Sequence, residues 1–237
     1  MLQKKPRYKP LYKKFVRLRK NVQNRRKLVV GNFKKQKWKN LITFLKTSIK
    51  RRKNNFRSYD QFSFFISKYS FPYKKKYLNK LLTKQRFRLF YGDISNKKLK
   101  KLLKTVNSSK QKKISASNLI INYLENRLDS ILYRAHFVKS IREARLIIQH
   151  GHVFINNVCN KNNAFLLTEG DVISISSNYS KQMKTNLFSS NLWPLPPEYL
   201  QINYKTFQIS ILNTFDKPSI FFAFPFFLDL PNIINYR

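Results

Sequence analysis

Four arginines near the middle of the chain, Arg127, Arg134, Arg142 and Arg145, have the chemistry and the spacing of a surface that binds phosphates. A guanidinium group is planar and donates paired hydrogen bonds to one phosphate, which suits recognition of a nucleic-acid backbone. On an α-helix, Arg127 shares a face with Arg134, and Arg142 lies beside Arg145. We therefore predict that two helices present these side chains to nucleic acid.

Three further side chains extend this candidate surface. Lys139 precedes the second arginine pair, and His150 and His152 flank Gly151 at the turn that follows. Other interpretations stay open, because exposed arginines are usually only solvated and a histidine beside a helix-ending glycine often bonds the last carbonyls. Arg127 can also pair with the acids two residues before and after it.

A helix that begins after Ser140 must position Arg142 and Arg145. Ser140 and Glu143 have the spacing of a capping box, in which the Ser140 hydroxyl accepts from the Glu143 N–H and the Glu143 carboxylate accepts from the Ser140 N–H. Gly151 is placed to close this helix in the left-handed conformation. The apolar residues of its buried face are Ile141, Ala144, Ile147 and Ile148.

The neighbouring segments predict a second helix and a small sheet. Residues 119–137 have apolar side chains at helical spacing and predict one continuous helix. Residues 153–155 and 172–175 are short β-branched runs, and Asn156 with Asn157 forms a plausible tight turn after the first run. The unit is therefore two helices followed by a small antiparallel sheet.

These residues carry a family resemblance. The segment NRLDSILYRAHFVKSIREARLIIQHGHVFINN, followed by LTEGDVISI, resembles the S4 RNA-binding domain, with its RLD opening, its S-x-x-E-A-R second helix, its H-G-H turn and its G-D exit. The resemblance implies an α-L motif that binds RNA through phosphate and hydroxyl positions. The same domain is also appended to pseudouridine synthases, some tyrosyl-tRNA synthetases and small RNA-binding stress proteins.

Three more blocks extend the resemblance to the ribosomal S4 family itself. KQRFRLFYGDISNKKLKKLL is similar to the segment that precedes the domain in that family, while PPEYLQINYKT and PFFLDLPNIINYR resemble its end. The first block adds Lys84, Arg86 and Arg88 to the RNA-binding candidates. The zinc-binding cysteine cluster of some bacterial members has no counterpart, and residues 1–73 match only loosely.

The resemblance implies a structural constituent of the small ribosomal subunit. Its expected partners are small-subunit rRNA, neighbouring proteins of the S3 and S5 types, and mRNA near the channel through which it enters the ribosome. Abundant Lys, Asn, Ile, Phe and Tyr with four Gly is typical of A+T-rich codons and suggests an organelle. We expect a mitochondrial protein, with a plastid one as the alternative.

An enzyme is the competing hypothesis, in the form of a pseudouridine synthase. Arg127-Leu128-Asp129 copies the R-L-D tripeptide in which those enzymes place their catalytic aspartate. Asp129 nevertheless lies inside the RNA-binding domain, where helical spacing accounts for it as an exposed or arginine-pairing acid. The segment after the domain is too short for a synthase fold. We expect no enzymatic activity, no cofactor and no metal site, since the single Cys159 excludes a cysteine cluster and is expected to pack as a small hydrophobe.

Basic charge is concentrated in the first half of the chain. Residues 1–113 hold 38 Lys and Arg against two acids, whereas residues 114–237 hold 11 against eight, so their formal net charges are +36 and +3 of the total +39. A polycation of this density favours a polyanionic partner such as RNA. A membrane is disfavoured, because residues 220–230 are short for a span and are broken by Pro225 and Asp229.

We predict an α+β fold with a mostly helical basic N-terminal domain, the compact RNA-binding domain and an extended C-terminal tail. The expected parts are a basic extension (1–73), a helical part (74–116), the S4-type domain (117–178) and a linker with a C-terminal segment that packs back on the body (179–237). Helices are expected over 38–49, 74–91 and from Ser95 to Val106. Residues 1–37 are interpreted as an extended RNA-binding arm rather than a cleaved leader, and residues 176–188 as a loop.

Overall fold

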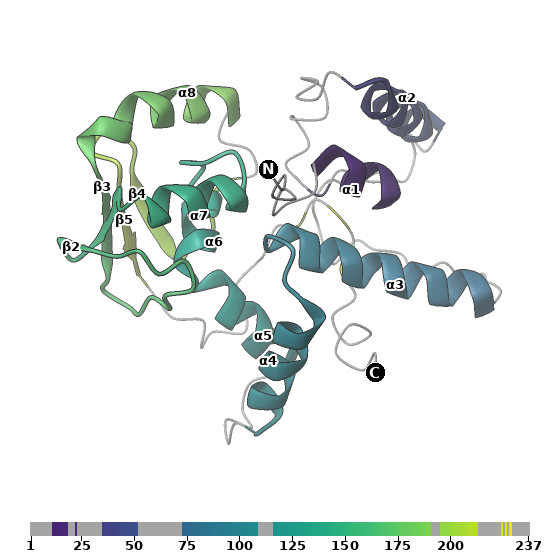
Figure 1. Ribbon diagram of the computed structural model, residues 1–237, viewed down its shortest axis with the longest axis horizontal. Helices are drawn as coiled ribbons and strands as arrows, with labels where there is room; N and C mark the ends of the chain where they lie inside the picture. The colour runs from purple at the N-terminus through teal and green to yellow at the C-terminus, as the bar shows by residue number, and fades with distance from the viewer. Residues whose placement is uncertain are drawn as a thin grey trace, which may run out of the picture. The chain divides into compact units, whose positions relative to one another are not determined.

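The computed structural model describes residues 11–18, 22, 35–51, 73–108, 116–190, 195–212, 224, 226 and 228. The chain divides into two compact units, which are described separately. Unit 1 comprises Met1–Arg86 and Phe224–Leu228, and unit 2 comprises Phe87–Ala223 and Asp229–Arg237. The elements are drawn in Figure 1, and they confirm the predicted α+β class. Among the described residues, we find no helix with the length and apolar character needed to span a membrane.

Unit 1 contains α1 (Leu11–Leu18), α2 (Gln36–Arg51) and most of α3 (Tyr73–Phe90). The helix predicted from Trp38 is confirmed, and Trp38 is buried with its ring 5.8 Å from that of Phe15 on α1. The interpretation of residues 1–37 as an extended arm is wrong for α1, because the helix buries Phe15 and Leu18 on one face. Parts of that arm, the side chains of Leu45 and Ile49, and residues 52–58 of a basic break expected over 51–58 lie outside the described residues.

The helix predicted over 74–91 is confirmed as α3, but its apolar spacing would place Tyr77 and Leu78 on the inward face, and the structure contradicts this. Tyr77 and Leu78 are exposed, while Phe87 and Phe90 are buried near its end. The rings of Phe87 and Phe90 pack edge-on against Tyr91, with centroids 5.2 and 5.0 Å away, so the apolar end of the helix is the part that unit 2 buries.

A tight connection leads from α3 to α4 (Asn96–Ser108). Gly92 has φ +76°, as expected for the glycine that ends a helix, and the Lys98 N–H donates to the Ser95 hydroxyl at 3.3 Å, which confirms the predicted cap. Helix α4 packs against α5 (Ala116–Glu125). Residues 109–115, in the predicted polar linker 107–117, lie outside the described part.

The continuous helix predicted over 119–137 is wrong, since the structure has two helices, α5 and α6 (Leu128–Arg134). Arg127 between them is extended and bridges Leu166. The Leu128 N–H donates to the Phe165 carbonyl and the Leu167 N–H to the Asn126 carbonyl, both at 3.0 Å. These long-range hydrogen bonds replace helical ones at the break.

The sheet has five antiparallel strands in the order β2-β1-β3-β5-β4. The predicted strands are confirmed as β1 (Val153–Ile155) and β3 (Val172–Ile175), and the predicted turn follows β1, with φ +47° at Asn156 and +68° at Asn157. Sequence analysis missed β2 (Val158–Cys159), β4 (Leu200–Asn203) and β5 (Gln208–Ile211). Cys159 is exposed on β2, so the expectation that it packs as a small hydrophobe is wrong.

Residues 176–188, predicted to be a loop, instead form a short 3-10 helix (Ser177–Tyr179) and most of α8 (Ser180–Ser190). The prediction failed because the buried face of α8 is narrow and partly polar. Met183 and Asn186 are both almost fully buried, and the Asn186 amide donates to the Phe137 carbonyl at 3.0 Å.

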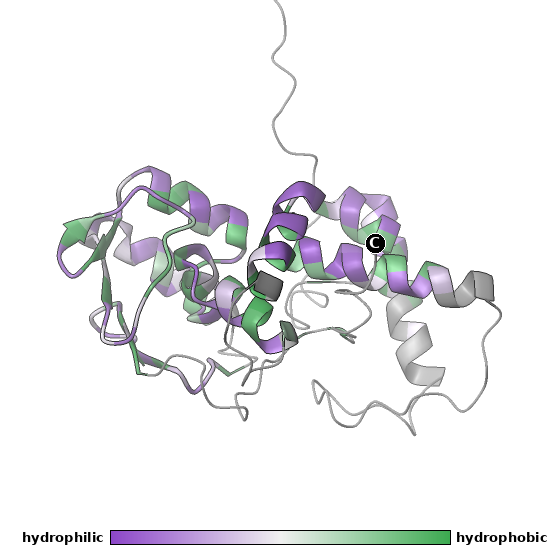
Figure 2. Cartoon of the chain, turned by 90° about the horizontal axis from the view of Figure 1, so that it is seen from below, coloured by the Kyte–Doolittle hydropathy of each residue, from purple (hydrophilic) through white to green (hydrophobic). Residues whose placement is uncertain are grey.

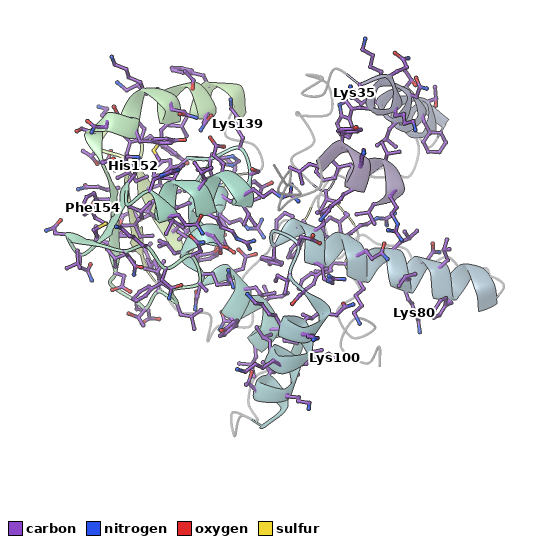
Figure 3. The ribbon with its side chains drawn as sticks, viewed as in Figure 1. Lys35, Lys80, Lys100, Lys139, His152 and Phe154 are labelled. Carbon is purple, nitrogen blue, oxygen red and sulfur yellow. The ribbon has the colours of Figure 1, made fainter. Side chains whose placement is uncertain are left out.

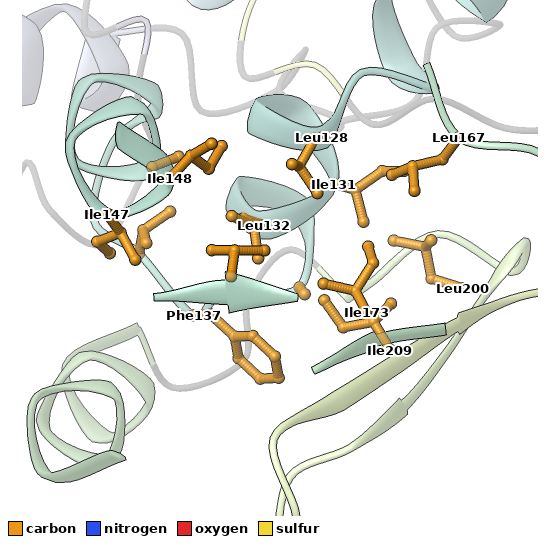
Figure 4. Close-up of a cluster of buried hydrophobic side chains, with 14 of the residues drawn as sticks. Leu128, Ile131, Leu132, Phe137, Ile147, Ile148, Leu167, Ile173, Leu200 and Ile209 are labelled. Atoms are coloured by element: carbon orange, nitrogen blue, oxygen red, sulfur yellow. The ribbon is translucent and has the colours of Figure 1, made fainter. Parts of the chain in front are cut away.

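One hydrophobic core joins α6, α7 (Ile141–Gln149) and the sheet (Figure 4). The apolar residues predicted for α7 are all buried, which confirms its inward face. Strands β3, β5 and β4 contribute Ile173, Ile209 and Leu200 to the same cluster (Figure 4). Helices carry both hydrophilic and hydrophobic bands in Figure 2, as expected when one face packs and the other meets solvent.

Candidate nucleic-acid interface

The start of α7 carries the predicted cap. Ser140 is extended, and its hydroxyl accepts from the Glu143 N–H at 3.3 Å. The Glu143 carboxylate does not return to the Ser140 N–H as expected but accepts from the Lys139 N–H at 2.7 Å. The cap therefore fixes the backbone that presents Lys139 as well as the first turn of α7.

Glu143 also ties α8 to the start of α7. Its other oxygen lies 3.3 Å from the Asn186 amide, 3.4 Å from the Gln182 amide and 3.5 Å from the Tyr179 hydroxyl. Burial and the neighbouring Glu143 raise the pKa of Tyr179 to about 12. These contacts hold one side of the candidate surface rigid.

Two of the candidate arginines meet at one aspartate. Arg127 donates from Nε and an Nη atom to the two oxygens of Asp129, at 3.0 and 2.8 Å. Arg145 donates from Nε to the same carboxylate at 2.7 Å. The Asp129 side chain is 1% exposed, against 16% for Arg127 and 18% for Arg145. We call these three residues the Asp129 cluster.

Arg145 continues from this cluster to the loop between α3 and α4. Its two Nη atoms donate to the carbonyls of Gly92 and Tyr91, at 2.8 and 3.0 Å. A Cβ atom added at Gly92 would lie 2.5 Å from Arg145 Nη2. Gly92 is therefore needed both for its backbone conformation and for the close approach of Arg145.

Arg134 lies in a second, fully buried cluster. It donates to both oxygens of Glu125, and the hydroxyls of Tyr91 and Tyr199 donate to the same carboxylate. The Arg134 guanidinium also lies over the Phe90 ring, 5.0 Å from its centroid. We call Tyr91, Glu125, Arg134 and Tyr199 the Glu125 cluster.

Burial and the charge of Glu125 together shift the pKa values of this cluster. Burial alone would lower the pKa of Arg134, but the Glu125 carboxylate more than offsets this, so the pKa is raised. Burial and the negative charge of Glu125 raise the pKa of Tyr91 and Tyr199 well above 10.0. The cluster therefore keeps one buried ion pair and two neutral tyrosines.

The structure shows that Arg127, Arg134 and Arg145 each pair with a buried carboxylate. The interpretation that Arg127 pairs with a nearby acid is confirmed for Asp129. Contact of Arg127, Arg134 and Arg145 with RNA stays a prediction, with Arg134 the least accessible at 6% side-chain exposure. Arg142 on α7 is partly exposed, and one of its Nη atoms is buried.

The remaining candidates occupy three places. Lys139 and His150 are exposed at the two ends of α7, while His152 stacks on Tyr179 and its Nδ1 lies 3.1 Å from the Ser176 hydroxyl (Figure 3). On α3, Lys84 is partly buried and Arg88 donates to the Ile94 carbonyl. Arg86 donates to the Leu18 carbonyl at 3.1 Å, and its burial lowers its pKa.

Sequence reasoning missed the residues that hold these arginines. Tyr91 and Tyr199 lie far from Glu125 along the chain, so no local pattern connects them. One signal was available: Glu125 is an acid at the end of an apolar helix, two residues before the R-L-D tripeptide. A carboxylate in that position needs a buried cation.

Asp129 has the environment of a structural acid. Both of its oxygens accept from arginine and its side chain is buried. A catalytic aspartate has to reach its substrate, and this carboxylate is enclosed by Arg127 and Arg145. In the part of the chain that the structure describes, no group of His, Cys, Asp and Glu could hold a metal ion.

Comparison with known proteins first defines the class of the central unit. Residues 126–173 match the S4 domain family. The match covers α6, α7, β1, β2 and the first two residues of β3, whereas Glu125, Tyr91, Tyr199 and the β4–β5 pair lie outside it. The chain therefore carries an S4 domain whose core is completed by flanking segments.

Longer similarities lead to one protein family. The chain is 36% identical over 174 residues to small ribosomal subunit protein uS4m of Reclinomonas americana, covering 69% of this chain and 66% of the relative. It is 33% identical over 156 residues to uS4 of Bartonella henselae, covering 65% and 72%, and 30% identical over 135 residues to uS4 of Cereibacter sphaeroides strain ATCC 17029, covering 56% and 64%. The aligned part thus spans slightly less than two thirds of the Reclinomonas and Cereibacter proteins. The chain belongs to the uS4 family of small ribosomal subunit proteins.

Proposed function

We propose that this chain is a non-catalytic constituent of the small ribosomal subunit that binds small-subunit rRNA. The observation that carries the proposal is the basic surface on α7 of an S4 domain in a chain of the uS4 family. Lys139, Arg142 and His150 form this surface, which we call the α7 surface. The cap at Ser140 and the bonds of Glu143 to α8 hold it in place.

The other arginines take two supporting roles in this proposal. Arg127 and Arg145 are partly exposed, so their remaining N–H groups can reach phosphates at the edge of the α7 surface while Asp129 orients them. Arg134 acts from within, because it joins α6 to Glu125, and of the predicted RNA contacts it is the least accessible. The proposed set of RNA contacts is completed by four further side chains, those of His152, Lys84, Arg86 and Arg88.

The proposed cellular setting is the mitochondrial small ribosomal subunit. The similarity to a mitochondrial uS4m and the composition typical of A+T-rich codons support an organelle. Two further proposals rest on the family resemblance. Proteins of the S3 and S5 types are neighbours of this chain, and the chain contacts mRNA near the channel through which mRNA enters the ribosome. The proposed boundaries between the four parts of the chain, after residues 73, 116 and 178, also stay a prediction.

A co-sedimentation experiment tests the proposal directly. The tagged chain should sediment with small ribosomal subunits, and its RNA binding should weaken with salt along a log–log slope steeper than about −3, because each neutralised duplex phosphate contributes about −0.9. Absence from the small-subunit fraction, or a shallower slope, would count against it.

A matched pair of variants separates the α7 surface from general charge. K139Q/R142Q removes two charges from this surface, and K181Q/K184Q removes two exposed charges from α8. The first pair should weaken binding to rRNA by about 60-fold at 0.1 M salt if both side chains contact phosphate. The second should have a much smaller effect, and equal effects would exclude the α7 surface.

A further inference from the structure

Strand β4 forms one edge of the sheet, and within the described residues it pairs only with β5. In an antiparallel pair, every second residue exchanges its backbone hydrogen bonds with the neighbouring strand. The Leu212 N–H donates to the Tyr199 carbonyl, which fixes this alternation for β4. Gln201, opposite Ser210, therefore bonds to β5, whereas the N–H and the carbonyl of Ile202 point away from β5 along the open edge.

Nothing on β4 protects this edge from a further strand. Proteins usually guard an edge strand with a lysine, a proline or a bulge. Residues Leu200–Asn203 include no charged residue and no proline, and their register with β5 runs without a bulge. The opposite edge strand, β2, is only two residues long. In a chain with 49 Lys and Arg, β4 is therefore an uncharged and unguarded edge.

The outer face of the sheet, which we define as the face away from the buried core, is also uncharged. Helices α6 and α7 pack with the core against the other face (Figure 4). Side chains of the outer face alternate with the buried ones along four strands and are partly or fully exposed: Phe154, Val172, Ser174, Gln201, Asn203, Gln208 and Ser210. None of them is charged, so these side chains offer no cation to a phosphate.

These observations select the kind of partner that fits the edge. An open edge alternates N–H donors with carbonyl acceptors, which is the pattern that an extended protein strand matches. RNA is held mainly through its phosphates, for which the outer face has no cation. A second copy of this chain is disfavoured, because each copy carries a formal net charge of +39. The occupant that fits is a strand of a different protein with no excess of positive charge.

We propose that β4 binds an extended strand of another protein of the small subunit, which continues the sheet beyond its present edge. Backbone hydrogen bonds to Ile202 supply the central contact. The partner presents an apolar side chain beside Ile202, which packs against the core, and uncharged or acidic side chains beside Gln201 and Asn203. The inference rests on the proposed function, because it places the partner in the assembled small subunit.

Hydrogen–deuterium exchange of the wild-type chain, resolved at single amides, tests the proposal in three states. The states are the full chain alone, the chain bound to small-subunit rRNA, and the assembled small ribosomal subunit. The Ile202 amide should exchange freely in the first two states and at least about tenfold more slowly in the third, the effect of one new hydrogen bond. The Gln201 amide already bonds to β5, so it is the internal control and should exchange slowly in all three states.

Cross-linking identifies what lies beside β4. The chain has a single cysteine, so Gln201→Cys combined with Cys159→Ser places one thiol on the outer face of β4, where it carries a short photo-cross-linker. In assembled subunits this thiol should join one protein, and ribonuclease should not remove the adduct.

A matched pair of substitutions at Ile202 tests the backbone bond itself. Ile202→Pro removes the outward N–H but none of the bonds to β5, while Ile202→Val retains this N–H. The proline variant should reduce the yield of the protein adduct at least about tenfold, and the valine variant should leave it unchanged. Circular dichroism of the free chain checks that both variants fold. If the proline variant unfolds, the exchange and cross-linking results with Ile202 in place decide.

The results that would overturn the proposal are distinct. An Ile202 amide that exchanges as fast in the subunit as in the free chain would show that no strand binds, while the proposed function stands. Slow exchange with rRNA alone, or an adduct that ribonuclease removes, would make the occupant RNA. Slowing in the free chain that grows with its concentration would make the occupant a second copy. If the chain is absent from small subunits, the proposed function fails and this inference with it.

Discussion

Replacing Glu125 by leucine should destabilise unit 2 by about 3–5 kcal/mol, the range found when one partner of a buried ion pair is removed. The substitution leaves the Arg134 guanidinium buried without its counter-charge. It also removes the acceptor of the Tyr91 and Tyr199 hydroxyls. Three side chains from three separate parts of the chain, Tyr91, Arg134 and Tyr199, thus lose their common partner.

Two effects bound this magnitude. Each orphaned tyrosine hydroxyl adds about 1–3 kcal/mol when it stays buried and unpaired. The Phe90 ring, 5.0 Å from the Arg134 guanidinium, retains about 0.5–2 kcal/mol of cation–π attraction and so offsets part of the loss. The expected cost therefore stays near the range for a single broken pair.

A double-mutant cycle isolates the ion pair. Glu125→Leu with Arg134→Met removes both charges and fills the space with apolar atoms, so the double variant should be less destabilised than the sum of the single variants by at least about 2 kcal/mol. Glu125→Gln keeps an acceptor for the tyrosines and serves as the isosteric control. Equilibrium urea unfolding of the full chain, followed by circular dichroism, measures the stabilities of the wild type and the four variants.

A loss below about 1 kcal/mol for Glu125→Leu would show that the cluster contributes no more than a surface ion pair. Additivity of the two single changes within about 0.5 kcal/mol would refute the coupling. In either case the buried cluster would not be what joins the flanking segments to the S4 domain.

The same cluster predicts a loss of stability at alkaline pH. The pKa of Tyr91 and Tyr199 is raised in the folded chain above the ordinary 10.0, so their contribution is complete below 10.0 and is lost as the pH rises toward the folded values. Unfolding should therefore expose two tyrosines that titrate together with the loss of structure. Tyr91→Phe with Tyr199→Phe should make the alkaline transition less steep, and an unchanged transition would contradict the assignment.

Three further predictions concern the loop and the helix that present the basic surfaces. Gly92→Ala should cost about 1–2 kcal/mol for its positive φ and more for displacing Arg145, whereas Gly170→Ala, with open space around it, should show only the φ cost; thermal unfolding compares them. Ser140→Ala should cost about 1 kcal/mol, and an unchanged melting temperature would mean that the cap contributes nothing to α7. Arg145→Lys should destabilise the free chain by about 1–3 kcal/mol, because the carbonyls of Tyr91 and Gly92 lose their donors, while Arg142→Lys should weaken RNA binding; an unchanged stability of the Arg145 variant would contradict its role in holding the loop.

Structural features that depend on residues close together in the sequence were predictable. The pairing of Ser140 with Glu143, the turn at Asn156 and the glycines at 92 and 151 each depend on a few adjacent residues. Apolar spacing also predicted the inward face of α7, since its buried residues are all aliphatic. These features were enough to indicate the two-helix and sheet arrangement of the central unit.

Features that depend on distant partners were not predictable from local pattern. The helix over 119–137 breaks because Phe165 and Leu167 bond to its backbone. The buried face of α8 includes the polar Asn186, so the spacing of its apolar residues does not indicate a helix. Arg145 donates to carbonyls that lie 53 and 54 positions earlier in the chain. The spacing of Arg142 and Arg145 suggested a phosphate-binding pair. It could not show that Arg145 holds the loop between α3 and α4.

The Glu125 cluster also sets an order of events during synthesis. Glu125 and Tyr199 are 74 positions apart, and at about 5–20 residues per second a translating ribosome needs about 4–15 s to make the chain between them. During that interval β3 has no β5 beside it, and the buried carboxylate lacks one of its donors. The lysines of α4 have already been made by then. A nascent chain of this kind offers RNA its charge several seconds before it can offer the finished shape of its central domain, so weak electrostatic capture precedes specific docking.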